Sequence, residues 1–185
     1  MSFRSPIFAL VVLCAVLCPA SRQGTSDNPD HPAGNRSELT LAGLRPGRSR
    51  LAEAVHRFSR HWKHPSEEEP DVYVWTVGGV QVTVEVDDRK VIRVVTVERH
   101  PLSAFGAPGS RRLGTGRGLG LGDSPGRLLV LYGKPFFRGP ASLEGRNVQL
   151  IVFNFSWVGA EVPQILESTF EQGKLIRMVL SADYY

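Results

Sequence analysis

The clearest pattern in the chain is a strict alternation of apolar and polar residues between Asp71 and Asp87. The segment VYVWTV is followed by Gly78-Gly79 and then by VQVTVEV. Alternation with a period of two is typical of strands, and Gly-Gly tolerates the positive φ angles that a two-residue hairpin requires. The sequence therefore predicts a hairpin with one apolar face, in which Val77 pairs with Val80, Trp75 with Val82 and Tyr73 with Val84.

Two other segments show helical spacing. Apolar residues recur at helical intervals from Leu51 to Trp62, and Ser49 is placed to cap the first turn. In the second segment Ser124 is the expected N-cap, Pro125 fits the first helical position, and Gly133 suits the C-terminal cap. Further strands are expected at residues 91–99, 150–158, 165–170 and 175–182, with a loop at 136–147.

Two pairs of short motifs indicate an internal duplication. GLRPGRS at 43–49 matches GLGLGDS at 118–124, and KVIRVV at 90–95 matches KLIRMV at 174–179. Both pairs keep the same order around a helix and strands, although short Gly and Val motifs also recur by chance. We predict an α+β fold of two tandem repeats, each a short helix packed on an antiparallel sheet of three or four strands. The repeats would span residues 39–100 and 118–185, with a flexible linker at 101–117.

The first 20 residues have the pattern of an export signal. Arg4 provides a positive charge, residues 7–17 are apolar, and small residues precede a cleavage position after Ala20. A membrane anchor and a buried N-terminal helix are the alternatives, but the apolar run is short for a span. We therefore predict an exported protein, periplasmic or secreted, with a signal peptide at 1–20 and a disordered tether at 21–38. No stable membrane span is expected after cleavage.

Both cysteines, Cys14 and Cys18, lie within this leader. A chain without the leader has no thiol, which excludes a disulfide framework, a cysteine nucleophile and a cysteine metal site. Leu13 and Leu17 precede the cysteines where a lipidation signal requires a small residue. The sequence therefore argues against a lipid anchor.

The charge of the chain and its candidate chemical motifs exclude several classes of function. The chain has 22 basic and 18 acidic residues, interspersed, and we expect no nucleic-acid binding. GTGRGLGLG at 114–122 has dinucleotide-loop spacing but no preceding strand, and His61 and His64 lack the further ligands that zinc needs. Ser49 and Ser124 are explained as helix caps. We expect no enzyme, no catalytic residue, no cofactor and no metal.

The candidate partner-binding residues are Arg93, Val95, Arg177 and Val179, which occupy matching positions in the two copies. If the neighbouring residues Ile92, Val94, Ile176 and Met178 face the helices, strand alternation places these four residues on the free face of the sheet. Leu175 would lie on the same face. Arginine among aliphatic side chains is typical of protein interfaces. The alternatives are that the two repeats bury this face between them, or that the arginines only prevent association of sheets.

With its glycine turn, short helix, Tyr-Gly-Lys-Pro at 132–135 and antiparallel strands, the second copy resembles the SmpA/OmlA (BamE)-like and β-lactamase inhibitory protein-like repeats. The resemblance covers residues 39–99 and 118–182. It implies helices on one sheet face and a free face for protein–protein binding, in envelope assembly or in inhibition of a secreted enzyme. The lipid-anchor cysteine and the inhibitor's disulfides are missing, so a β-lactamase target does not carry over.

We therefore expect an exported, non-enzymatic protein-binding module that uses the free face of its sheet. The alternatives are a structural assembly protein associated with the outer membrane or envelope and, third, a hydrolase.

Overall fold

The computed structural model describes residues 39–99, 113–155 and 164–182. These residues all belong to one compact unit, Asn35–Tyr185. The predicted signal peptide and tether, and residues 101–112 of the predicted linker, lie outside the described residues. The strand predicted at 150–158 is described only as far as Phe155.

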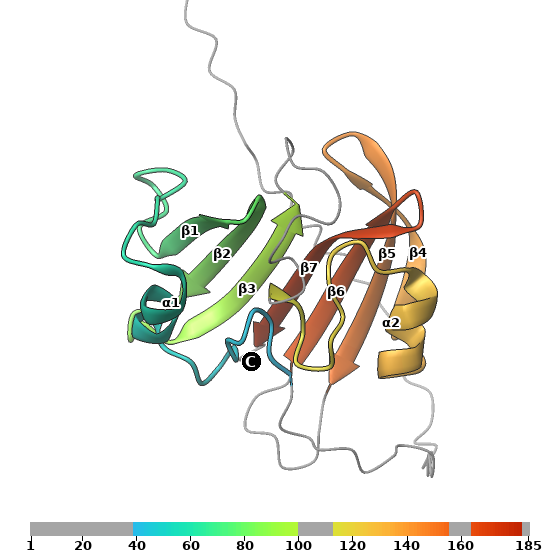
Figure 1. The fold of residues 1–185 in the computed structure, drawn as a ribbon, viewed down its shortest axis with the longest axis horizontal. Coiled ribbons are helices and arrows are strands. Elements are labelled where there is room, and N and C mark those ends of the chain that lie inside the picture. The colour runs from blue at the N-terminus through green and yellow to red at the C-terminus, as the bar shows by residue number, and fades with distance from the viewer. Residues whose placement is uncertain (1–38, 100–112, 156–163, 183–185) are drawn as a thin grey trace, which may run out of the picture. The chain divides into compact units, whose positions relative to one another are not determined.

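Seven antiparallel strands form a single sheet (Figure 1). Their spatial order is β1-β2-β3-β7-β6-β5-β4. Two helices of eight residues each accompany them, α1 (Leu51–Phe58) and α2 (Pro125–Tyr132). The strands are β1 (Val72–Val77), β2 (Val80–Val86), β3 (Ile92–Arg99), β4 (Phe137–Leu143), β5 (Arg146–Phe155), β6 (Gln164–Glu171) and β7 (Lys174–Ala182).

This architecture overturns the predicted fold class. The described chain is mainly β, with one continuous sheet in place of two α+β repeats that each have their own. The join is the antiparallel pairing of β3 with β7, in which Val95 lies opposite Leu180 and Val97 opposite Met178. Pairing these two strands satisfies the backbone groups of two edges that would otherwise be open. The periodicity of the sequence predicts which face of each strand is apolar, but it does not predict which strands pair with each other.

The hairpin prediction is confirmed in full. Val77 pairs with Val80, Trp75 with Val82 and Tyr73 with Val84. Gly78 and Gly79 have φ angles of 56° and 76°, which a residue with a Cβ adopts at a cost. The local chemistry of the turn and the alternation of the strands were sufficient to set this register.

The helix boundaries were predicted with mixed success. Ser124 caps α2 by accepting a hydrogen bond from the Arg127 backbone N–H at 3.3 Å, and Gly133 ends the helix, as expected. At α1 the N-cap is Arg50, whereas Ser49 was predicted. The helix also ends before Ser59, which has a φ of 120°, and so does not reach Trp62.

A strand was missed between residues 136 and 147, where a loop was predicted. β4 contains Gly139 and Pro140, which are poor strand formers. Its partner and its turn decide its conformation, because Glu144 and Gly145 close a two-residue hairpin with φ angles of 51° and 78°.

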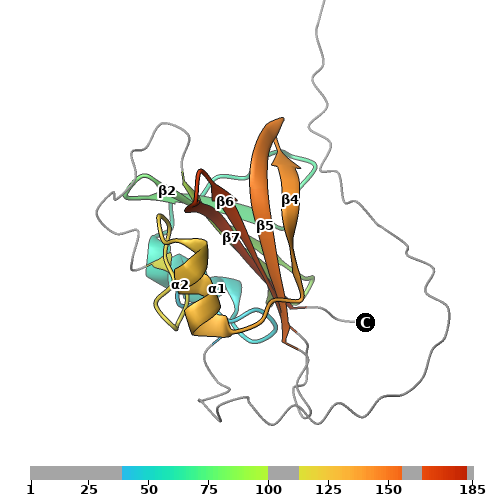
Figure 2. The same ribbon diagram turned by 90° about the vertical axis from the view of Figure 1, so that its right-hand side faces the viewer.

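Both helices lie on the same face of the sheet (Figure 2). The core fills the space between them and the sheet, and its largest fully buried side chains include Trp75, Phe170, Leu128 and Met178. We call this side of the sheet the helix face and the opposite side the outer face.

The two Gly-turn segments run together across the helix face. Leu41 bridges Thr115, and the Ala42 N–H donates to the Gly114 carbonyl at 3.0 Å. Leu113 and Thr115, which fall within the linker predicted from sequence, are buried.

Candidate functional site

A β-bulge in β3 changes the direction of the predicted site residues. Glu85 of β2 pairs with Val94 and Val86 pairs with Ile92, so Arg93 is the inserted residue. The insertion reverses the alternation that the sequence suggests. Ile92 still faces the core, but Val94 lies on the outer face.

A second bulge lies in β7, one position earlier in the matching motif. Thr169 pairs with Arg177 and Phe170 with Leu175, so Ile176 is the inserted residue. Equivalent contacts confirm the offset. The Gly47 N–H donates to the carbonyl of Ile92, and the Gly122 N–H donates to the carbonyl of Leu175, both at 2.8 Å. The structural equivalent of Ile92 is therefore Leu175, whereas the motif match pairs it with Ile176.

The four predicted partner-binding residues consequently do not share one face of the sheet. Arg177 and Val179 lie on the outer face, as expected. Val95 has 0% exposure in the core and pairs with Leu180, so its predicted place on the free face is wrong. Leu175 is also in the core. Arg93 occupies the bulge, and its position does not match that of Arg177.

The outer face consists of three cross-strand rows that follow from the pairing registers. They contain aliphatic side chains and one aromatic ring among polar and charged groups. The rows are Thr76, Gln81, Glu98, Arg177, Thr169 and Leu150; Val74, Thr83, Thr96, Val179, Glu167, Val152 and Phe137; and Val72, Glu85, Val94, Ser181, Ile165 and Asn154.

Charged and polar side chains are linked within the first row. The Gln81 amide donates to Glu98 at 3.0 Å, and Arg177 Nε lies 3.6 Å from the other carboxylate oxygen. Burial raises the pKa of Glu98 above its ordinary value of 4.5, and the Arg177 guanidinium only partly offsets this effect. Desolvation, with repulsion from Glu69 adding to it, also raises the pKa of Glu85. The outer face therefore carries partly desolvated acids.

This shift predicts a pH dependence of stability. Because the pKa of Glu98 is higher in the folded than in the unfolded chain, the folded state retains the proton more readily. The contribution of Glu98 to the free energy of unfolding therefore falls as pH rises from its ordinary pKa through the raised value. We expect the free energy of unfolding of Glu98→Gln to increase relative to that of the wild type as pH rises from 4.5 through the raised pKa, measured by urea denaturation. A difference that is constant with pH would contradict this assignment.

Phe137 is the aromatic residue of the outer face that sequence reasoning missed. It is 44% exposed, and its ring lies over Gly139 in the same strand, where a Cβ would meet it at 2.7 Å. The signal that could have revealed it is Glu144-Gly145, a two-residue turn between FRGPASL and RNVQL.

Both edges of the sheet are protected within the described residues. On β1, Lys63 bridges Val74 through two backbone hydrogen bonds of 2.9 Å. On β4, Pro140 has no N–H to offer to an added strand. These edges therefore do not favour a partner that binds by adding a strand to the sheet.

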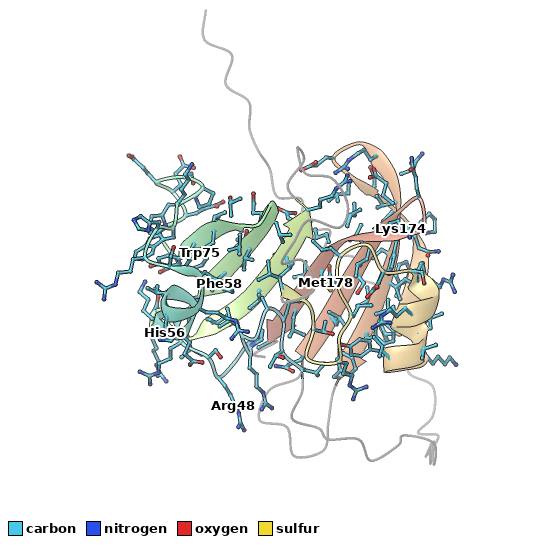
Figure 3. The ribbon with its side chains drawn as sticks, in the orientation of Figure 1. Arg48, His56, Phe58, Trp75, Lys174 and Met178 are labelled. Atoms are coloured by element: carbon cyan, nitrogen blue, oxygen red, sulfur yellow. The ribbon has the colours of Figure 1, made fainter. Side chains whose placement is uncertain are left out.

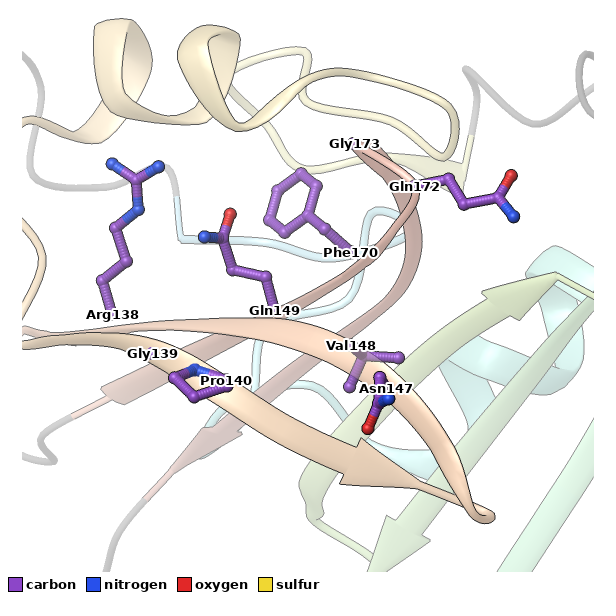
Figure 4. Close-up of a pocket in the computed structure, with 9 residues that line it drawn as sticks. All are labelled: Arg138, Gly139, Pro140, Asn147, Val148, Gln149, Phe170, Gln172 and Gly173. Carbon is purple, nitrogen blue, oxygen red and sulfur yellow. The ribbon is translucent and has the colours of Figure 1, made fainter.

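A shallow hollow of 560 Å³ lies beside the β4–β5 hairpin (Figure 4). Arg138, Gln149 and Phe170 project to the same side of the sheet around it. Its lining contains a guanidinium, amides and an aromatic ring, but no histidine, cysteine or carboxylate. It therefore lacks both a nucleophile–base pair and an acid–base pair.

The described residues hold no group of three His, Cys, Asp or Glu side chains that could bind a metal ion. In the same three ranges, no helix has the length and apolar character needed to cross a membrane.

Comparison with known proteins gives little guidance. No family model matches the chain, and no curated protein matches it. A solved structure with a similar arrangement is that of YjgB, a DUF4309 family protein from Bacillus subtilis. It is 14% identical, with 79% of this chain and 88% of that chain covered and a TM-score of 0.47. This distant likeness assigns no function, and the resemblance to BamE-like repeats stays a prediction.

Proposed function

We propose that the protein is a non-enzymatic binding module whose outer face docks against another protein, and that it acts after export. One observation supports this above the others: the outer face carries aliphatic side chains and Phe137 among polar ones, opposite the face that the helices cover. Protein interfaces combine such an apolar centre with a polar rim. The export step rests on the leader pattern of residues 1–20.

The charges of the face indicate the kind of partner. Glu85, Glu98 and Glu167 contribute three acids to the rows, whereas Arg177 contributes one base. A complementary partner would place apolar side chains against Val179 and Val152 and basic groups at the rim. Such charge complementarity would speed association and favour one orientation of docking.

The test is affinity capture from the extracellular or envelope fraction with immobilised wild type and two outer-face variants, Val179→Asp and Phe137→Ala. Truncating or charging an interface anchor is expected to lower recovery of the specific partner roughly tenfold or more. The amount of each captured protein would be measured by quantitative mass spectrometry.

Val130→Asp is the matched control, because Val130 is 87% exposed on α2 and so lies on the helix side. It should capture the same proteins as the wild type. Thermal unfolding of every variant shows that the fold is retained. If the outer-face variants and the wild type recover the same proteins in equal amounts, the outer face is not the binding surface.

A further inference from the structure

The net positive charge of the chain is concentrated in residues 45–64. This stretch contains six of the 22 basic residues and one of the 18 acidic residues, so the rest of the chain has 16 basic and 17 acidic residues. It also contains three of the five histidines. The sequence-based description of interspersed charge therefore does not hold here, since this segment accounts for the whole basic excess.

The fold turns these charges to solvent. α1 packs Leu51, Val55 and Phe58 against the core and buries Ala54, which leaves its polar side outward. The exposed basic residues come from the loop before α1, from α1 itself and from the segment after it; they are Arg48, Arg50, Arg57, Arg60 and Lys63.

The one acid of the stretch is occupied within the chain. Glu53 accepts hydrogen bonds from the Ser49 hydroxyl at 3.0 Å and from the Arg50 backbone N–H at 2.9 Å. These bonds direct the carboxylate to the first turn of the helix. No salt bridge from Arg57, Arg60 or Lys63 is found among the described residues.

The surface around α1 is shaped by the neighbouring glycine turn. The Arg57 guanidinium lies directly against Gly43, where a Cβ would meet it at 2.3 Å. A shallow hollow between this turn and α1 is also lined by His56 and Glu53. Figure 3 shows Arg48 and His56 at the α1 end of the sheet, away from Lys174.

An exposed indole lies in the same stretch. Trp62 is 36% exposed and falls between Arg60 and Lys63 in the sequence. Its ring contacts Tyr73 edge-on at 5.9 Å and Trp75 at 6.5 Å between centroids. A partly exposed tryptophan flanked in sequence by cations is typical of protein surfaces that rest at the headgroup level of an anionic bilayer, although here the acidic run Glu67–Glu69 follows it.

We propose that residues 45–64 dock the protein onto an anionic phospholipid surface, with the cations at the lipid phosphates and Trp62 at the headgroup boundary. Single-stranded nucleic acid is a poorer fit, because it requires aromatic rings that are free for bases to stack on, and Trp62 already packs against two other rings. This surface belongs to the helix side, except for Lys63, which pairs with Val74 at the β1 edge and therefore lies on the side of the outer face. The acidic outer face remains available to a protein partner, and variants that leave Lys63 in place test the two proposals separately.

The test is sedimentation of the full chain with phosphatidylcholine vesicles and with vesicles containing roughly one-third phosphatidylglycerol. We expect tighter binding to the anionic than to the neutral vesicles, and loss of that difference between about 0.1 and about 1 M salt, where the screening length falls to about 3 Å. The triple variant Arg50→Gln/Arg57→Gln/Arg60→Gln should bind roughly 100-fold more weakly. Brominated lipid should quench tryptophan fluorescence in the wild type, and quench it less in Trp62→Phe.

The matched control is Lys134→Gln/Arg138→Gln/Lys174→Gln, which removes the same number of charges from exposed positions in the other half of the chain. It should bind the anionic vesicles like the wild type. The leader is identical in every variant, so any contribution from it cancels. Equal binding of the two triple variants, equal quenching in Trp62→Phe, or binding to DNA or heparin without binding to anionic vesicles would each overturn the proposal.

Discussion

Replacing Trp75 by alanine is expected to lower the free energy of unfolding by about 3–5 kcal/mol. Trp75 is 2% exposed, and its ring contacts Phe58 of α1 at 5.6 Å between centroids. Its Nε1–H also donates to the carbonyl of Ser59 at 3.1 Å, which fixes the chain at the point where α1 ends. The alanine variant loses apolar contacts, leaves a cavity and removes the donor from Ser59.

Trp62 provides the comparison, since it belongs to the same aromatic cluster but is 36% exposed. Trp62→Ala should cost only about 1 kcal/mol, close to the value of one aromatic contact. Urea denaturation monitored by circular dichroism measures both changes. Equal losses in the two variants would show that Trp75 does not anchor α1 as described.

The second large effect distinguishes Val95 from Val179, which the sequence motifs pair with each other. Val95→Ala is expected to cost about 2–3 kcal/mol, because the side chain is wholly buried between β2 and β7 and its removal leaves a cavity. Val179→Ala should cost under about 1 kcal/mol, because that side chain lies on the outer face.

The same two variants also separate stability from binding. Val179→Ala should weaken capture of a protein partner while leaving the unfolding midpoint nearly unchanged. Val95→Ala should lower the unfolding midpoint. Under conditions in which this variant is still folded, its outer face should bind the partner like the wild type. If the two substitutions change stability equally, the bulge at Arg93 does not divide the faces as the pairing register indicates.

These two residues also show why sequence reasoning placed half of the candidate site correctly. The sequences KVIRVV and KLIRMV do match, and this match identified Arg177 and Val179 as candidate binding residues. The bulges fall on Arg93 in one strand and Ile176 in the other, so equal positions in the motifs are unequal positions in the sheet. Bulges depend on the partner strand and on the loops that hold them.

The sequence by itself determined the β1–β2 hairpin and its register, the start and end of α2, and the apolar side of α1. Each depends on neighbours a few residues apart, where turn chemistry, capping and periodicity act directly. Only the tertiary structure decided that β3 joins β7 in one sheet, that residues 137–143 form β4, and which face Val95 occupies. Those outcomes depend on which strands pair although they are far apart in the sequence. The hydrophobic pattern of each strand by itself does not specify its partner.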